Sequence, residues 1–160
     1  FDEYVKWPLE ERLRRLARTP DDLAEAVRGQ SEAVLARRPD AKNWAAKEIV
    51  CHLRDTEEYF MGRFQMVLAM EEPKFFPPEQ DRWAEERQYL RNDVEAALAA
   101  FRRRREDTLK LLSGLTAEQW QRAGISAARG RMTLDDHASV MPAHDDNHLD
   151  QLARALEGRA

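Results

Sequence analysis

The sequence predicts an all-α fold, a bundle of four principal helices. Alanine, leucine, arginine and glutamate dominate its 160 residues and glycine is scarce, a composition that favours helices. Hydrophobic residues recur at helical spacing in four separate stretches, and strands do not alternate with helices along the chain. The length suits one domain with a sizeable core, which we expect to span residues 1–160.

The first part of the chain predicts short helices separated by breaks. Pro8 at a first-turn position indicates a helix over residues 8–17. Pro20 disfavours the helical conformation at the residue before it, so we expect an interruption there. A second short helix then ends near Val27, and residues 31–37 add another helical piece before a turn.

The best defined helix covers residues 44–70, with Asn43 as its N-terminal cap. Its apolar positions recur at helical spacing on one face, and His52 lies within that face. Three prolines in the following segment end the helix, because proline lacks the N–H group that a helix interior needs. Residues 81–90 add a turn or two of helix in the connection.

A capping box formed by Asn92 and Glu95 begins the third principal helix, which ends at Gly114. The basic run at residues 102–105 is followed at once by two acids. This pattern is typical of a solvated helix face with ion pairs one turn apart. Arg105 alone of the four lies near the inward side of the helix.

One helical turn from Thr116 and a loop over residues 123–132 lead to the last helix, residues 133–156. The first residue of this helix pairs with Asp136 in a second capping box. Pro142 lies inside the helix, so we expect a kink or a freed carbonyl group at that point. The extra helical turns therefore belong to the connections and not to the bundle.

Two histidines on the last helix form the main candidate site. His144 and His148 are four residues apart, which is about 40° of rotation and about 6 Å along the axis, so both rings project from one face. That face is apolar, and buried imidazoles need polar partners, which a shared metal ion supplies. His52 lies on the apolar face of another helix, and we expect it to be the third ligand. Three histidines leave open positions for water or substrate, as in catalytic metal sites.

Each ligand ring needs an acceptor for its second nitrogen, and the candidates are Asp55, Asp145 and Gln151. The alternative is a chance pair of histidines held by hydrogen bonds alone. His137 lies about 10 Å before His144 along the axis, so we interpret it as a pocket-edge or surface residue. A zinc-protease motif requires glutamate at the position of Asp145, so we expect no metalloprotease.

Two motifs together resemble those of one known family. "NWAAKEIVCHL" at residues 43–53 matches a pattern of tryptophan, then a lysine–glutamate pair, then histidine–leucine. "HDDNHLDQL" at residues 144–152 matches a His-Asp-x-x-His-x-x-Gln pattern. Both are similar to motifs of the DinB-like (DinB/YfiT) superfamily of metal-binding four-helix bundles, and the likeness covers residues 9–156. The resemblance implies an up-down-down-up bundle, often a homodimer, whose motif histidines bind nickel, zinc or another divalent ion.

The family resemblance also implies a chemistry. Similar members include thiol-dependent transferases and isomerases that use mycothiol, bacillithiol or glutathione, and others are named only as metal-dependent hydrolases. We therefore expect an S-transferase whose metal ionises a low-molecular-weight thiol for attack on a small electrophile. Hydrolysis, with Asp145 as the base, is the rival reaction. A non-catalytic metal-binding module of the stress response is the third alternative.

Charge, hydropathy and cysteine content argue against other classes of protein. The net charge of −4 argues against general nucleic-acid binding. No apolar run approaches the roughly 18 residues that a membrane span needs, and no signal segment is recognisable. The single cysteine, Cys51, suits a reducing cytosol, so we expect a cytoplasmic protein. Cys51 points about 100° away from His52, which predicts a small buried hydrophobe and not a ligand.

Overall fold

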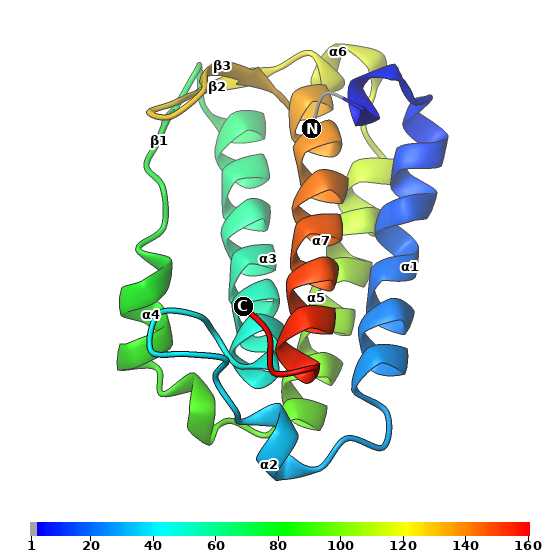
Figure 1. Ribbon diagram of the computed structural model, residues 1–160. Coiled ribbons are helices and arrows are strands. Elements are labelled where there is room, and N and C mark those ends of the chain that lie inside the picture. The colour runs from blue at the N-terminus through cyan, green and yellow to red at the C-terminus, as the bar shows by residue number, and fades with distance from the viewer. Residues whose placement is uncertain (1–2) are drawn as a thin grey trace.

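Four long helices form the bundle in the computed structural model, which describes residues 3–160. They are α1 (Leu9–Val27), α3 (Ala46–Ala69), α5 (Val94–Ser113) and α7 (Leu134–Leu156). Both α1 and α3 pack against α5 and α7. In Figure 1, α1 and α7 descend whereas α3 and α5 ascend, so the predicted all-α, up-down-down-up bundle is confirmed. None of the helices in the described part of the chain is long and apolar enough to cross a membrane.

The connection between α3 and α5 produces the unusual order of directions. After α3 the chain enters β1 (Lys74–Phe75) and returns along the outside of the bundle through α4 (Gln80–Glu86) and η2 (Tyr89–Arg91). It reaches the opposite end before α5 begins, so α3 and α5 run parallel (Figure 1). The other short elements are η1 (Tyr4–Lys6), α2 (Glu32–Leu35) and α6 (Ala117–Trp120).

The segment expected to be a loop before α7 is a β-hairpin, and here the prediction is wrong. β2 (Ala123–Ser126) pairs antiparallel with β3 (Gly130–Thr133), and β1 adds to β2 in parallel. A Cβ atom at Gly124 would lie only 2.2 Å from the Phe75 ring, so only glycine lets β1 approach this closely. The hairpin is therefore stabilised by a strand some fifty residues earlier in the chain, which local sequence does not reveal.

The interruption predicted at Pro20 is absent, because α1 continues through this residue to Val27. Proline lacks an N–H group, so the carbonyl group of Leu16 loses its helical donor. The guanidinium group of Arg105 replaces that donor, with its Nη1 2.9 Å from the Leu16 oxygen. A hydrogen bond from α5 thus compensates the defect. α7 likewise continues through Pro142.

One predicted helix cap is confirmed, and two others lie a few residues away from their predicted positions. Thr133 and Asp136 form the predicted capping box at the start of α7, with both N–H···O distances at 2.9 Å. Asp93, not Asn92, caps α5. α3 begins three residues after Asn43, whose side chain bonds to the preceding turn instead. Such shifts do not change which face of each helix is buried.

Two apolar clusters fill the core, and buried polar side chains lie between them. One cluster includes Leu23, Leu53, Phe101 and Leu152, and the other includes Leu16, Phe60, Leu112 and Met141. On each long helix, a buried polar residue falls between members of the two clusters. We call this layer the polar belt, and its members are Thr19, Glu57, Arg105 and Asp145. The candidate histidines lie near this belt: His144 and His148 flank Asp145 on α7, and His52 lies five residues before Glu57 on α3.

Candidate metal centre

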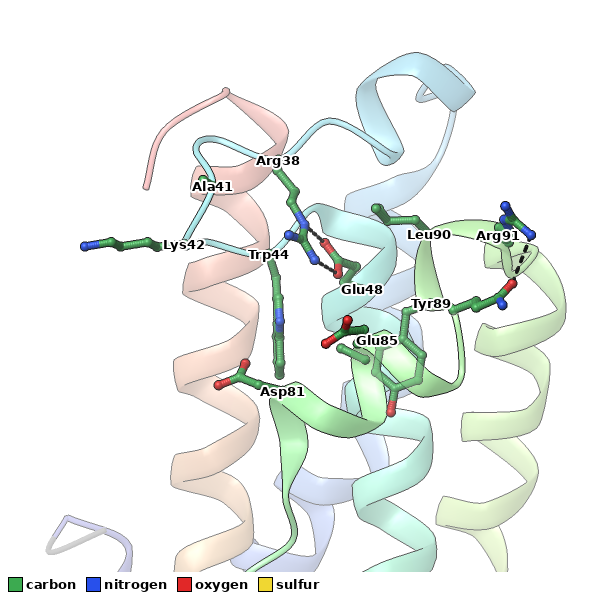
Figure 2. Close-up of a pocket in the computed structure, with 12 residues that line it drawn as sticks. Arg38, Ala41, Lys42, Trp44, Glu48, Asp81, Glu85, Tyr89, Leu90 and Arg91 are labelled. Carbon is green, nitrogen blue, oxygen red and sulfur yellow. Dashed lines mark hydrogen bonds and ion pairs between the residues drawn. The ribbon is translucent and has the colours of Figure 1, made fainter.

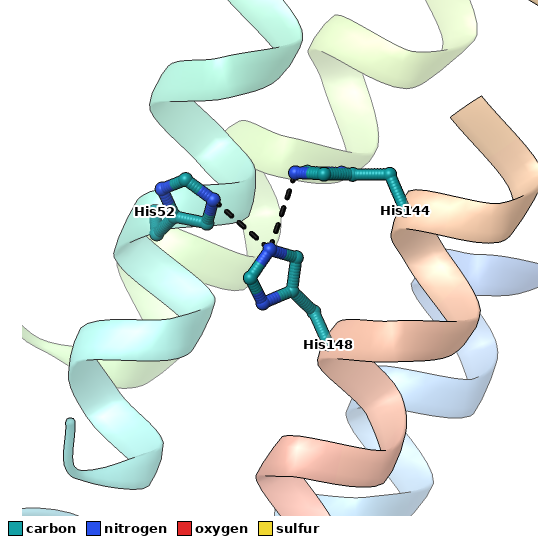
Figure 3. Close-up of side chains that lie close together, drawn as sticks. All are labelled: His52, His144 and His148. Carbon is teal, nitrogen blue, oxygen red and sulfur yellow. Dashed lines mark hydrogen bonds between the residues drawn. The ribbon is translucent and has the colours of Figure 1, made fainter. Parts of the chain in front are cut away.

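The structure brings His52, His144 and His148 together between α3 and α7 (Figure 3). His148 Nε2 lies 3.1 Å from His52 Nε2 and 3.2 Å from His144 Nε2, and the three candidate ligand atoms lie within 4.8 Å of one another. Two nitrogens bound tetrahedrally to one ion at about 2.0–2.1 Å would lie about 3.4 Å apart. The residues therefore fit a single divalent ion with three nitrogen ligands.

The environment keeps all three imidazoles uncharged at neutral pH. Burial and repulsion by the neighbouring rings lower the pKa of His52 to about 2. Burial, together with His148 and Arg105, lowers the pKa of His144 to about 3. Burial also lowers the pKa of His148. Neutral imidazole is the form that binds metal ions, so the cluster is ready to bind one without losing protons.

Two neighbouring side chains contact the rings of His148 and His52, and one of them fixes which nitrogen of His148 faces the cluster. Gln151 Oε1 lies 2.8 Å from His148 Nδ1 and accepts its hydrogen. The Thr56 hydroxyl donates to the His52 carbonyl oxygen at 2.6 Å and lies 3.3 Å from His52 Nδ1 and 3.4 Å from its Nε2, so it contacts the ring without selecting one nitrogen. The Gln151 contact holds the hydrogen on Nδ1 of His148 and leaves the Nε2 lone pair of that ring for a ligand bond.

Replacing Gln151 with alanine is expected to raise the metal dissociation constant about tenfold, because His148 loses the acceptor that orients its ring. Competition with a chromophoric chelator measures the change. Gln151→Glu keeps an acceptor at the same position and serves as the matched control, with affinity close to that of the parent chain. Equal affinities for all three proteins would show that the contact does not orient the ring.

Asp145 does not support a histidine ring, contrary to the prediction. It is fully buried and accepts hydrogen bonds from Thr19 at 2.5 Å and from Arg105 at 2.7 and 3.1 Å. Arg105 also donates to Glu57 at 2.8 and 2.9 Å and to the Leu16 carbonyl, so all five of its N–H groups have acceptors. The expected solvated face thus does not include Arg105, which ties α1, α3, α5 and α7 together.

Asp55 is likewise engaged away from the histidines. Its carboxylate accepts from Arg54 at 2.9 Å, from Arg87 at 3.0 Å and from the Tyr89 hydroxyl at 2.7 Å. Burial alone would raise the pKa of Asp55, but these hydrogen bonds outweigh it and lower the pKa to about 2. Asp55 therefore anchors the α3–α5 connection. It affects the pKa of His52 only electrostatically, without a hydrogen bond to the ring.

A pocket of about 220 Å³ opens beside the histidine cluster. His52 and His144 form part of its wall, and the hairpin contributes Ser126 and Met132. None of the residues that line it within the described chain is aspartate or glutamate. A bound metal ion would therefore have an adjoining space of small-molecule size, which a purely structural site does not need.

A larger pocket of about 820 Å³ lies at the start of α3 (Figure 2). There Arg38 forms a two-pronged ion pair with Glu48 at 2.6 and 2.7 Å. Trp44 lines this pocket, and its ring also lies 4.9 Å from the ring of His52. We place the functional site in the smaller pocket, because of the two it alone is lined by His52 and His144.

The fourth histidine and the cysteine lie outside the cluster. His137 is fully buried, against the expectation of a pocket-edge or surface position. Its ring packs edge-on against Phe64 and Phe75, and its Nδ1 lies 2.8 Å from the Thr133 carbonyl oxygen. Cys51 is buried as predicted, and burial raises the pKa of its thiol to about 11, so it is no nucleophile at neutral pH.

Comparison with known proteins identifies the family. This chain is 20% identical over 156 residues to a protein of Oceanobacillus iheyensis that is provisionally named a metal-dependent hydrolase. The match covers 95% of this chain and 87% of the Oceanobacillus protein. The structure of YfiT from Bacillus subtilis, described as a probable metal-dependent hydrolase with an unusual four-helix-bundle topology, superposes with a TM-score of 0.88. It is 22% identical, and the match covers 97% of this chain and 90% of YfiT. The sequence model of the DinB superfamily matches residues 15–152, and the chain therefore belongs to that superfamily.

Proposed function

We propose that His52, His144 and His148 hold one divalent metal ion and that the protein is a metal-dependent enzyme. The observation that carries this proposal is the convergence of three neutral imidazoles beside a pocket of small-molecule size. A divalent ion there would lower the pKa of a thiol or water molecule that it binds and would orient it. Imidazole ligands suit both nickel and zinc.

The reaction that we propose is transfer of a low-molecular-weight thiol to a small electrophile. The sulfur of the ionised thiol forms a bond to the electrophilic carbon, the leaving group departs with its electron pair, and the thiol proton passes to solvent. This chemistry needs no base from the protein. Asp55 and Asp145 are both committed to arginines, and no acid lines the described part of the pocket.

The protein's own side chains would position the reactants. Gln151 holds His148 in the tautomer that directs Nε2 toward the cluster, and Thr56 contacts the ring of His52. Phe60, Met132 and Val140 give the pocket an apolar wall that limits the access of water. These residues bind and orient, whereas the nucleophile comes from the cosubstrate.

Hydrolysis is the second candidate, because the Oceanobacillus protein and YfiT are both named as metal-dependent hydrolases. Asp145 does not suit the role of base that this reaction needs, since Arg105 and Thr19 hold its carboxylate. A hydrolase would therefore depend on a base from the substrate or from solvent. A non-catalytic metal module is the third candidate, and the pocket beside the histidines argues against it.

Metal analysis followed by activity assays tests this proposal. The purified protein is expected to hold close to one equivalent of nickel or zinc after dialysis. Metal-loaded protein is expected to conjugate at least one of cysteine, glutathione or a sugar-linked thiol to monobromobimane at least tenfold faster than metal-free protein. Cleavage of 4-nitrophenyl esters without thiol would favour the hydrolase instead. Bound metal without either activity would favour the non-catalytic module.

A further inference from the structure

The pocket beside the histidines extends along one face of α3. His52, Thr56, Tyr59 and Arg63 follow at spacings of four, three and four residues, so they share that face, and all four line the pocket. Arg63 lies about 16 Å beyond His52 along the axis, and helical side chains slant back toward the start of their helix. Its guanidinium group therefore faces the pocket at some distance from the histidines.

Aromatic contacts hold Arg63 in place. Its Nη2 donates to the Tyr59 hydroxyl at 2.8 Å. Its Cζ atom lies 4.6 Å from the centre of the Tyr59 ring and 4.8 Å from that of Phe75, which β1 contributes. Stacking of this kind restrains a guanidinium group without neutralising its charge. The position of the cation is thus fixed before any ligand arrives.

No carboxylate among residues 3–160 lies within 4.0 Å of the Arg63 nitrogens. Other interior arginines differ, since Arg15, Arg54 and Arg105 each pair with an aspartate or glutamate. The Nε atom of Arg63 is buried and has no hydrogen-bond acceptor among these residues. A buried guanidinium donor without an acceptor is unfavourable, so the site has a cation and a donor available for an incoming anion.

We propose that this part of the pocket is an anion subsite, in which Arg63 binds the carboxylate or phosphate group of the substrate. The inference rests on the proposed function, because it places the reactive end of that substrate at the histidines. The volume of about 220 Å³ suits a small organic anion. The apolar wall formed by Phe60, Met132 and Val140 suits a hydrocarbon body between the two ends.

Calorimetric titration with simple probes tests the subsite. Benzoate and phenyl phosphate are titrated into zinc-loaded and metal-free protein, with benzamide as the uncharged probe. In both forms, at least one anion is expected to bind at least tenfold more tightly than benzamide, and the stronger one identifies the anionic group preferred. Arg63→Met is expected to abolish this preference, whereas Arg63→Lys keeps part of it. Arg103→Met removes the same charge from an exposed position and is expected to leave binding unchanged.

The outcomes separate this inference from the proposed function. Equal anion affinity in the parent protein and Arg63→Met would overturn the subsite, as would anion binding that is lost in His148→Ala but kept in Arg63→Met. Metal content is measured on every sample, and Arg63→Met is expected to retain it. A parent protein without metal would contradict the proposed function, while the metal-free titrations would still test Arg63. If Arg63→Met does not fold, Arg63→Gln replaces it with the same expectation.

Discussion

Replacing His148 with alanine is expected to abolish tight binding of a divalent ion, with a rise of at least about 100-fold in the dissociation constant. His148 is the central member of the cluster, since its Nε2 lies within 3.2 Å of both other rings. The variant keeps one histidine on α3 and one on α7, and it lacks the ring that lies close to both of them. Elemental analysis after dialysis gives the metal content, and competition with a chelator gives the affinity.

His137→Gln is the matched control for this experiment. His137 lies on the same helix and is buried, but it belongs to the aromatic packing around Phe64 and not to the cluster. The control is expected to bind metal like the parent chain. A second measurement is the melting temperature, which added metal should raise in the parent but not in His148→Ala, because only the former binds the ion in its folded state. Equal metal content in both proteins would rule out the three-histidine site.

Replacing Arg105 with methionine is expected to lower the free energy of unfolding by about 3–5 kcal/mol, the range for breaking a buried ion pair. Arg105, Glu57 and Asp145 are almost completely buried. Burial alone would lower the pKa of Arg105, but Asp145 and Glu57 outweigh this effect and raise it, so the cation persists at any ordinary pH. Methionine fills similar space but leaves two carboxylates facing each other. Denaturation with urea measures the loss.

Two further variants locate the cause of this destabilisation. Arg102→Met removes an arginine of the same helix that pairs with Asp21 at the surface, and an exposed pair is worth about 0–1 kcal/mol. Combining Arg105→Met with Glu57→Gln and Asp145→Asn removes all three charges and is expected to recover much of the stability. A loss for Arg105→Met as small as that for Arg102→Met would mean that the polar belt contributes little to the fold.

The sequence predicts the candidate site best where the spacing of its residues matches the helical repeat. His144 and His148 are a single helical turn apart, and His52 occupies the inward face of α3, so the apolar pattern that buries each helix also turns these rings inward. The four long helices follow from the same pattern. The same spacing places Gln151 beside His148, because it lies three residues further along α7.

Features that depend on contacts between distant segments were not predictable from local sequence. Pro20 signals a break, yet Arg105 from α5 supplies the hydrogen bond that keeps α1 continuous. Asp145 follows a candidate ligand in sequence but turns about 100° away on the helix, toward Arg105. The β-hairpin is stabilised by pairing with β1, which lies far away in the sequence. The contact between Arg63 and Phe75 of β1 likewise joins two separate elements, so local sequence does not point to Arg63 as an anion-binding residue.

The division of the histidines between α3 and α7 also governs when the site comes into existence. His52 and His144 are 92 residues apart, so a ribosome completes α3 long before it begins α7. A nascent chain that has produced only α3 presents a lone imidazole, which cannot retain an ion. Affinity arises when α7 docks and closes the bundle, and the binding energy then stabilises the closed form. Metal capture would thus report that the last helix has assembled with the others.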